Sequence, residues 1–198
     1  MAAVLRAGGV VVLPTDTVVG LAASPADAAA MARIATLKGR PPEQACAVLV
    51  ADVDQGLALL EGPPAAARAW ADRWWPGPLT LVGRRSAVAA DYALGGDPTT
   101  IGVRCPADPL VREVAALAGP IAATSANRHG APTAATPAAA AADLTGPVDL
   151  VVPAAPGAGD APSGVASTVV DVTVEPWVVL REGDVSGEDL ARAGGAGS

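Results

Sequence analysis

Polar side chains that could hold an anionic ligand stand at the ends of predicted strands and helices. Lys38 and Arg40 follow an expected helix, and Arg104 and Arg181 lie near the ends of expected strands. Hydroxyl, amide and carboxylate groups are placed in the same way, at Thr15, Asp16, Thr17, Thr99, Thr100, Ser125, Asn127, Ser167 and Thr168. Because ligands of open α/β sheets bind at strand ends, the pattern predicts one shared cleft.

Lys38 is the one lysine among thirteen basic residues, and the other twelve are arginine. An ammonium is a compact point charge suited to a phosphate oxygen, whereas a guanidinium is a planar fork, so a site can need one and reject the other. The exception predicts that Lys38 binds phosphate. The alternative is that Lys38 and Arg40 only complement the negative end of the helix before them.

The other candidates also have structural alternatives. Arg104 could form a surface ion pair with Asp108, and Arg181 could face solvent or the neighbourhood of Glu182. The side chains of Ser125 and Asn127 could cap a turn.

Several common kinds of site are excluded. His129 is the only histidine, which argues against a histidine-based metal site and a Ser-His-Asp triad. The sequence contains neither a GxxxxGKS/T phosphate loop nor a GxGxxG motif after a strand. Cys46 and Cys105 lack a partner at metal-ligand spacing and are expected to be buried structural thiols in a reducing compartment. The chemistry is therefore left to cations, hydroxyls and backbone groups.

Charge and hydropathy limit the partners and the location. A net charge of −7 argues against a broad nucleic-acid interface, which needs a basic face. The longest apolar runs, at 8–14 and 45–51, are far shorter than the roughly 20 residues of a membrane span. The first residues do not have the pattern of a secretory signal. We expect a cytoplasmic protein that binds neither membranes nor, strongly, nucleic acid.

The elements that would carry these residues alternate between strands and helices. We expect strands at 9–14, 18–23, 45–51, 75–83, 99–105, 121–127, 148–152, 167–172 and 176–182. We expect helices at 2–7, 25–37, 53–60, 64–74, 109–117, 137–144 and 186–192. The order predicts a single α/β domain over residues 1–198, with a core at about 2–190 and helices on both faces of a twisted mixed sheet. Residues 154–163 are expected to form a mobile loop, and 194–198 a frayed tail.

Seven segments together resemble the YrdC-like family of threonylcarbamoyl-AMP synthases, in its short single-domain form. They are PTDTVVGL (14–21), KGRP (38–41), WPGPLTLV (75–82), TIGVRCP (100–106), TSANRHG (124–130), ASTVVDV (166–172) and VLREG (179–183). The order and approximate spacing match over residues 2–190. The resemblance implies a three-layer α/β fold of the YrdC/RibB type with a concave basic cleft.

The activity that the resemblance implies is synthesis of threonylcarbamoyl-AMP from L-threonine, bicarbonate or CO₂ and ATP, with release of pyrophosphate. The product would pass to downstream transferase proteins that make threonylcarbamoyladenosine in tRNA. Mg²⁺ is expected with ATP, held by phosphate and water rather than by a protein cage. Such a reaction needs alignment and charge neutralisation more than a proton shuttle, which suits a chain with one histidine.

The resemblance also implies a role for each site residue. The residues implied in catalysis are Lys38, Arg40, Ser125 and Asn127. Those implied in ATP binding are Lys38, Arg40, Thr100, Asn127, Thr133 and Arg181. Those implied in threonine binding are Thr17, Arg104, Ser125 and Ser167, with the Arg104 guanidinium on the carboxylate.

The sequence departs from the family pattern at three places. Val19 stands where the family commonly has Tyr, Ala45 and Cys46 stand for a Pro-Leu pair, and Ala166 stands for Glu. We expect these changes to open space, or remove a carboxylate, at the amino-acid end of the cleft. These departures leave room for a related carbamoyl-adenylate-forming enzyme or carbamoyltransferase with another acceptor. The basic cleft of the fold leaves open a second alternative, a non-catalytic nucleotide- or RNA-binding protein.

Overall fold

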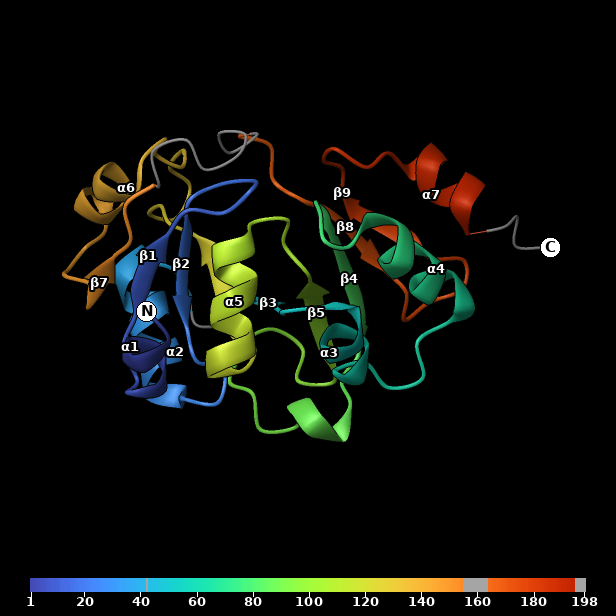
Figure 1. The fold of residues 1–198 in the computed structure, drawn as a ribbon, viewed down its shortest axis with the longest axis horizontal. Coiled ribbons are helices and arrows are strands. Elements are labelled where there is room, and N and C mark those ends of the chain that lie inside the picture. The colour runs from blue at the N-terminus through green and yellow to red at the C-terminus, as the bar shows by residue number, and fades with distance from the viewer. Residues whose placement is uncertain (42, 155–163, 195–198) are drawn as a thin grey trace.

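The computed structural model describes residues 1–41, 43–154 and 164–194, and nine strands of these residues form one sheet (Figure 1). The strands are β1 (Val11–Leu13), β2 (Gly20–Ala23), β3 (Ala47–Leu49), β4 (Leu79–Arg84), β5 (Thr100–Arg104), β6 (Ile121–Ser125), β7 (Leu150–Val151), β8 (Thr168–Asp171) and β9 (Val178–Arg181). Most of the predicted loop at 154–163 and of the tail at 194–198 lies outside the described residues.

The sheet is mixed, as predicted, with the order β7-β1-β2-β6-β3-β5-β4-β8-β9. The pairs β1/β7, β3/β5 and β4/β8 are parallel, and the other neighbours are antiparallel. The strand order brings segments far apart in the sequence side by side. As a result β6, β3 and β5 are central neighbours, although two other strands, three helices and a 3₁₀ turn separate β3 from β6 along the sequence.

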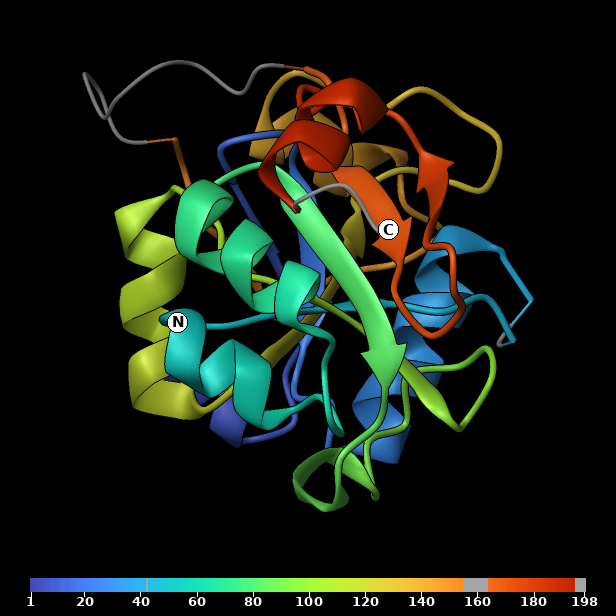
Figure 2. The same ribbon diagram turned by 90° about the vertical axis from the view of Figure 1, so that its right-hand side faces the viewer.

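Helices cover both faces of the sheet, which confirms the prediction. They are α1 (Ala2–Arg6), α2 (Ala28–Lys38), α3 (Val53–Ala58), α4 (Ala65–Trp74), α5 (Pro109–Ala118), α6 (Pro137–Asp143) and α7 (Gly187–Ala193). Alternate residues of one strand enter different clusters: Val11 and Leu13 pack with α1 and α5, whereas Val12 packs in the larger cluster with α2. Figure 2 shows α2 and α5 on opposite sides of the sheet. None of the helices in the described ranges has the length and apolar character that a membrane span requires.

The boundaries of α2 place Lys38 beside the end of the central strand β6. The helix was expected to start at Pro25, and this was wrong because Asp27 is the N-cap, its carboxylate accepting from Ala30 N at 2.9 Å. Gly39 ends the helix with φ 59°, a left-handed conformation that costs glycine little. Lys38 therefore occupies the last turn, and Arg40 leaves the helix beyond it.

A tryptophan fastens the C-terminal helix to the rest of the molecule. Trp70 on α4 is fully buried, donates from Nε1 to the Leu190 carbonyl at 2.9 Å, and meets Trp177 edge-on with ring centroids 5.1 Å apart. Replacing Trp70 by phenylalanine removes the donor and leaves the Leu190 carbonyl without it. We expect the unfolding free energy in urea to fall by about 2 kcal/mol. The same change at half-buried Trp74 should have a smaller effect, and equal effects would contradict this role.

Candidate functional site

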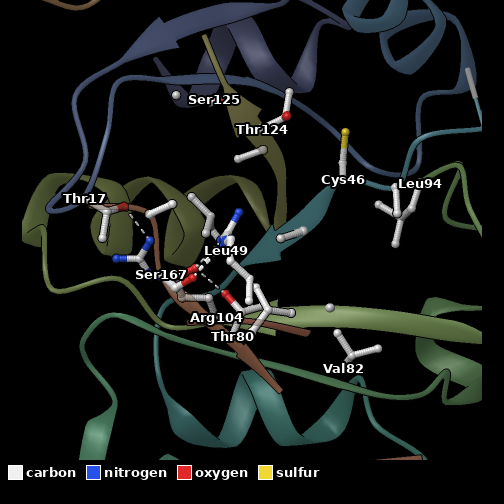
Figure 3. Close-up of a pocket in the computed structure, with 18 of the residues that line it drawn as sticks. Thr17, Cys46, Leu49, Thr80, Val82, Leu94, Arg104, Thr124, Ser125 and Ser167 are labelled. Carbon is white, nitrogen blue, oxygen red and sulfur yellow. Dashed lines mark hydrogen bonds between the residues drawn. The ribbon is translucent and has the colours of Figure 1, made fainter. Parts of the chain in front are cut away.

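One cavity of about 510 Å³ is lined by residues from both halves of the sheet, a size that suits a small-molecule site (Figure 3). Seven of the ten predicted site residues line it: Thr17, Thr100, Arg104, Ser125, Thr133, Ser167 and Arg181. The other three, Lys38, Arg40 and Asn127, are not on its wall. In Figure 3, Thr17 and Arg104 lie at one side of the cavity, and Cys46 and Leu94 at the other.

The Arg104 guanidinium dominates the first side. It donates from Nη1 to Thr17 Oγ1 at 2.7 Å, from Nη2 to Asp16 Oδ2 at 2.7 Å, and from Nε to the Gly77 carbonyl at 2.9 Å. The alternative pairing with Asp108 is wrong, because Asp108 instead caps α5. Arg104 is thus held from three directions by residues distant in the sequence.

Arg104 and Asp16 form an ion pair that is largely buried. Arg104 is 5% exposed, and burial lowers its pKa while Asp16 opposes the shift. The group still stays cationic at neutral pH, as arginine does in proteins. Asp16 Oδ2 also accepts from Ala107 N at 3.0 Å, whereas Oδ1 is buried without a hydrogen-bond partner. Asp16 therefore orients Arg104, but its unpartnered oxygen makes the pair sensitive to the loss of the cation.

A second arginine, Arg181 on β9, also lines the cavity, close enough to Arg104 for its charge to contribute to the lowered pKa of Arg104. Arg181 donates to the Ser167 carbonyl from Nε at 3.0 Å and from Nη2 at 2.8 Å, and Nη2 reaches Ser167 Oγ at 3.1 Å. Ser167 Oγ also shares a 2.8 Å hydrogen bond with Thr80 Oγ1. Burial lowers the pKa of Arg181. The contacts join β4, β8 and β9 and fix the hydroxyl of Ser167 at the cavity wall.

Lys38 lies behind the wall and holds the loop after β6. Its ammonium donates to the carbonyls of Ser125 and Asn127, the latter at 2.7 Å, and to Asn127 Oδ1 at 3.3 Å. Lys38 is 4% exposed, and burial, with a smaller contribution from Arg40, lowers its pKa to about 8. These acceptors belong to the end of β6 and the loop after it, and not to the last carbonyls of α2. The alternative in which Lys38 only complements the negative end of its helix therefore does not account for its contacts.

Arg40 is half-buried beside Lys38. Its Nη2 donates to Cys46 Sγ at 2.8 Å and its Nη1 to Thr124 Oγ1 at 3.4 Å, while Nε is buried without a partner. Burial raises the pKa of Cys46, with Arg40 opposing. Both cysteines are buried, as predicted, but Cys46 also lines the cavity.

The loop after β6 is braced from within. Asn127 Nδ2 donates to the carbonyls of Arg128 at 2.9 Å and Ala131 at 2.6 Å, and Thr133 Oγ1 donates to Asn127 Oδ1 at 3.4 Å. His129 N donates to the Lys38 carbonyl at 2.8 Å. The Asn127 side chain therefore caps the turn, as the structural alternative proposed, and it also accepts a hydrogen bond from Lys38.

The structure separates the three departures from the family pattern. Ala45, Cys46 and Ala166 line the cavity. Val19 does not: it is 2% exposed and packs in the core, so the expectation that it opens the cleft is wrong. The reason is the alternation of strand residues, which puts Val19 on the same side as Leu21 and leaves Gly20 at the cavity.

Several polar residues of the wall were not predicted as site residues, among them Thr80, Asp97 and Thr124. Thr80 lies in the quoted segment 75–82, but its type alone gave no signal. Asp97 precedes the Thr99-Thr100 pair that was noted as polar and is the one carboxylate among the described lining residues. The position of Asp97 just before a strand is the signal from which it could have been predicted as a site residue.

The described ranges contain no group of three or more His, Cys, Asp or Glu side chains that could hold a metal ion. The polar side chains that line the cavity are mainly hydroxyls and the guanidinium groups of Arg104 and Arg181, with Asp97 as the one carboxylate in the described part of the wall. This set suits an anionic ligand and does not fit a resident metal centre.

Comparison with known proteins identifies relatives. Residues 3–183 match the model of the Sua5/YciO/YrdC family, described as "Telomere recombination". The chain is 36% identical over 189 residues to threonylcarbamoyl-AMP synthase of Pyrococcus abyssi, covering 95% of this chain and 54% of that protein. It is 35% identical over 187 residues to a putative threonylcarbamoyl-AMP synthase of Mycobacterium tuberculosis H37Rv, covering 94% and 84%.

Solved structures show the same fold. The crystal structure of P. abyssi Sua5 complexed with L-threonine matches with a TM-score of 0.87 and 36% identity, over 97% of this chain and 55% of that one. The structure of Escherichia coli YciO matches with a TM-score of 0.80 and 26% identity, over 96% and 90%. The chain thus spans about half the length of the P. abyssi protein and most of YciO.

Proposed function

The chain belongs to the Sua5/YciO/YrdC family, and from this membership we propose that it synthesises threonylcarbamoyl-AMP from L-threonine, bicarbonate or CO₂ and ATP, releasing pyrophosphate. The observation that carries the proposal is the cavity itself. It brings Thr17, Arg104 and Ser167 together at one wall and places Ser125, held by Lys38, at another.

The side of the cavity with Arg104 suits an amino-acid carboxylate. A guanidinium has five N–H groups, one on Nε and two on each Nη. Arg104 uses three of them for protein contacts, one from each nitrogen. One N–H remains on Nη1 and one on Nη2, which is the pair that binds a carboxylate in a bidentate manner. Thr17 and Ser167 would then contact the rest of the threonine.

The loop held by Lys38 suits the phosphates of ATP. All three ammonium protons have acceptors in the structure, and the longest contact is the one to Asn127 Oδ1. A phosphate oxygen would replace this acceptor, so that Lys38 binds the ligand while still holding the carbonyls of Ser125 and Asn127. Arg40, with its unpartnered Nε, adds a second cation beside it.

The proposed reaction follows from this arrangement. The threonine amine attacks CO₂, forming an N–C bond and losing a proton, to give a carbamate. A carbamate oxygen then forms a bond to the α-phosphorus of ATP as the bond from that phosphorus to the bridging oxygen breaks, and pyrophosphate leaves. The protein supplies alignment and neutralises charge. Mg²⁺ would enter with ATP, because the donor set at the cavity offers no metal cage.

Nucleotide binding should weaken as pH rises, because Lys38 has a pKa of about 8 in the free protein. Below this pH the group carries the charge that attracts phosphate, and above it the charge is lost. We expect ATP affinity to fall as pH rises from 7 to 9, approaching tenfold per unit above 8. Equilibrium binding measurements at fixed ionic strength test this, with Lys38→Met as the control that should lack the dependence. The same pH dependence in both proteins would contradict the assignment.

Pyrophosphate release tests the activity directly. Purified protein should release pyrophosphate from ATP only when both threonine and bicarbonate are present. Release without threonine, or no release at all, would refute the proposal.

One observation favours keeping a second candidate, a related enzyme with another acceptor. Ala45, Cys46 and Ala166 depart from the family pattern and line the cavity, where a bound substrate would contact them. Replacing threonine by serine and other amino acids in the same assay separates the two candidates. In either case we propose that the product passes to transferase proteins that modify tRNA and that the protein acts in the cytoplasm.

A further inference from the structure

Asp97 lines the same cavity as Arg104. Its Oδ1 accepts from Thr99 N at 2.8 Å and from Thr99 Oγ1 at 2.7 Å, whereas Oδ2 has no partner among the described residues. These bonds lower the pKa of Asp97, which therefore is ionised at neutral pH. An exposed carboxylate with one occupied and one available oxygen thus stands at the opening of the cavity.

The segment that carries Asp97 is held in place from several sides. Arg85 donates to the Tyr92 carbonyl at 2.8 Å and to the Thr100 carbonyl at 3.1 Å. Cys46 N donates to the Leu94 carbonyl at 2.9 Å. Because both ends of the segment are anchored, the position of the Asp97 carboxylate is set before any ligand binds.

The charges of the cavity differ along its length. Arg104 lies at one side, with Arg181 near it, and Leu94, close to Asp97 in the sequence, lies at the other (Figure 3). Asp97 and the apolar side chain of Ile101 also line the cavity. We propose that Asp97 binds the ribose hydroxyls of the nucleotide, with the base on the apolar wall beside it and the phosphates toward Lys38 and Arg40. This inference rests on the proposed use of ATP.

The chemistry of the groups favours the ribose over the other parts of ATP. A carboxylate repels a phosphate. The edge of adenine presents acceptor nitrogens next to its amino group. A carboxylate there would accept one hydrogen bond from the amino group but would be repelled by the neighbouring ring nitrogen, because it has no proton to donate. A vicinal diol offers two donors, and Asp97 Oδ2 accepts both. Carboxylates hold the ribose hydroxyls of dinucleotides in the same way.

Equilibrium binding of ATP, 2′-deoxyATP and 3′-deoxyATP tests the proposal. The wild-type protein should bind ATP at least about tenfold more tightly than either deoxynucleotide, because a hydrogen bond to a charged group is lost in each. Asp97→Asn keeps an oxygen that can accept from Thr99. It should bind ATP about tenfold more weakly and the two deoxynucleotides almost as the wild type does, so that the preference disappears. Asp91→Asn, at an exposed carboxylate off the cavity wall, should keep the preference.

The outcomes are separable. Absence of ATP binding, equal binding of the three nucleotides to the wild type, or a preference retained by Asp97→Asn would each overturn the role of Asp97. If the wild type discriminates through Asp97 but makes no threonylcarbamoyl-AMP, the proposed function fails while the ribose site stands. If the product forms and the preference does not depend on Asp97, only the ribose site fails.

Discussion

Replacing Arg104 by alanine is expected to lower the free energy of unfolding by about 3 kcal/mol and turnover by at least about 100-fold. Loss of the guanidinium leaves Asp16 without its cation at a site where one carboxylate oxygen is already unpartnered. Breaking a buried pair in this way costs roughly 3–5 kcal/mol, and the lower figure applies because the Asp16 side chain is 18% exposed. Turnover is expected to fall because, under the proposed function, the carboxylate of threonine loses both of its donors.

A double variant separates the two effects of this change. Arg104→Met combined with Asp16→Asn removes both charges, so stability should return most of the way to the wild-type value while turnover stays low. Urea denaturation and pyrophosphate release measure the two quantities. Arg84→Ala, at an exposed arginine on neighbouring β4, should change neither. Normal turnover in the double variant would show that Arg104 does not bind substrate.

Replacing Lys38 by alanine is expected to lower kcat/KM for ATP by about 10²–10³, the loss typical of removing one preorganised electrostatic contact from a site. The change removes the cation nearest the proposed phosphate position and also the donor that holds the carbonyls of Ser125 and Asn127. Lys38→Arg should not restore activity, because a planar guanidinium cannot replace a compact ammonium among three acceptors.

The matched control for Lys38 lies on the same helix. Arg33 forms a surface ion pair with Asp149, with 44% of its side chain exposed. Arg33→Ala should leave kcat/KM unchanged and alter stability little. Unchanged kinetics in Lys38→Ala, or full activity in Lys38→Arg, would refute the role assigned to Lys38.

Much of the fold could be predicted because hydrophobic runs and turn residues coincide along the chain. The run of valines before Pro14 forms β1, and Gly119-Pro120 separates α5 from β6. Where the boundary of α2 was wrong, a local hydrogen bond decided it: proline suits a first turn, but the carboxylate of Asp27 caps the helix two residues later. The short 3₁₀ turn at Ala87–Ala89 has no hydrophobic period and was not predicted.

The site could be predicted as a set of residues but not as a set of contacts. The alternative for Arg104 was a local pair with Asp108, whereas its partner Asp16 is 88 residues away and meets it only after the sheet has formed. Val19 was assigned to the cleft, although strand alternation turns it into the core. Lys38 was expected on the cavity wall, and its contacts with loop carbonyls depend on the tertiary packing of α2 against the end of β6.

In the proposed reaction this cavity joins threonine, a carbamate carbon and AMP. Incubation of the purified protein with ATP, L-threonine and ¹³C-labelled bicarbonate, followed by mass spectrometry, tests it most directly. We expect threonylcarbamoyl-AMP carrying one ¹³C atom, and its absence when threonine is omitted or Lys38→Ala is used. ATP bound by the protein with no labelled adenylate formed from threonine would contradict the account.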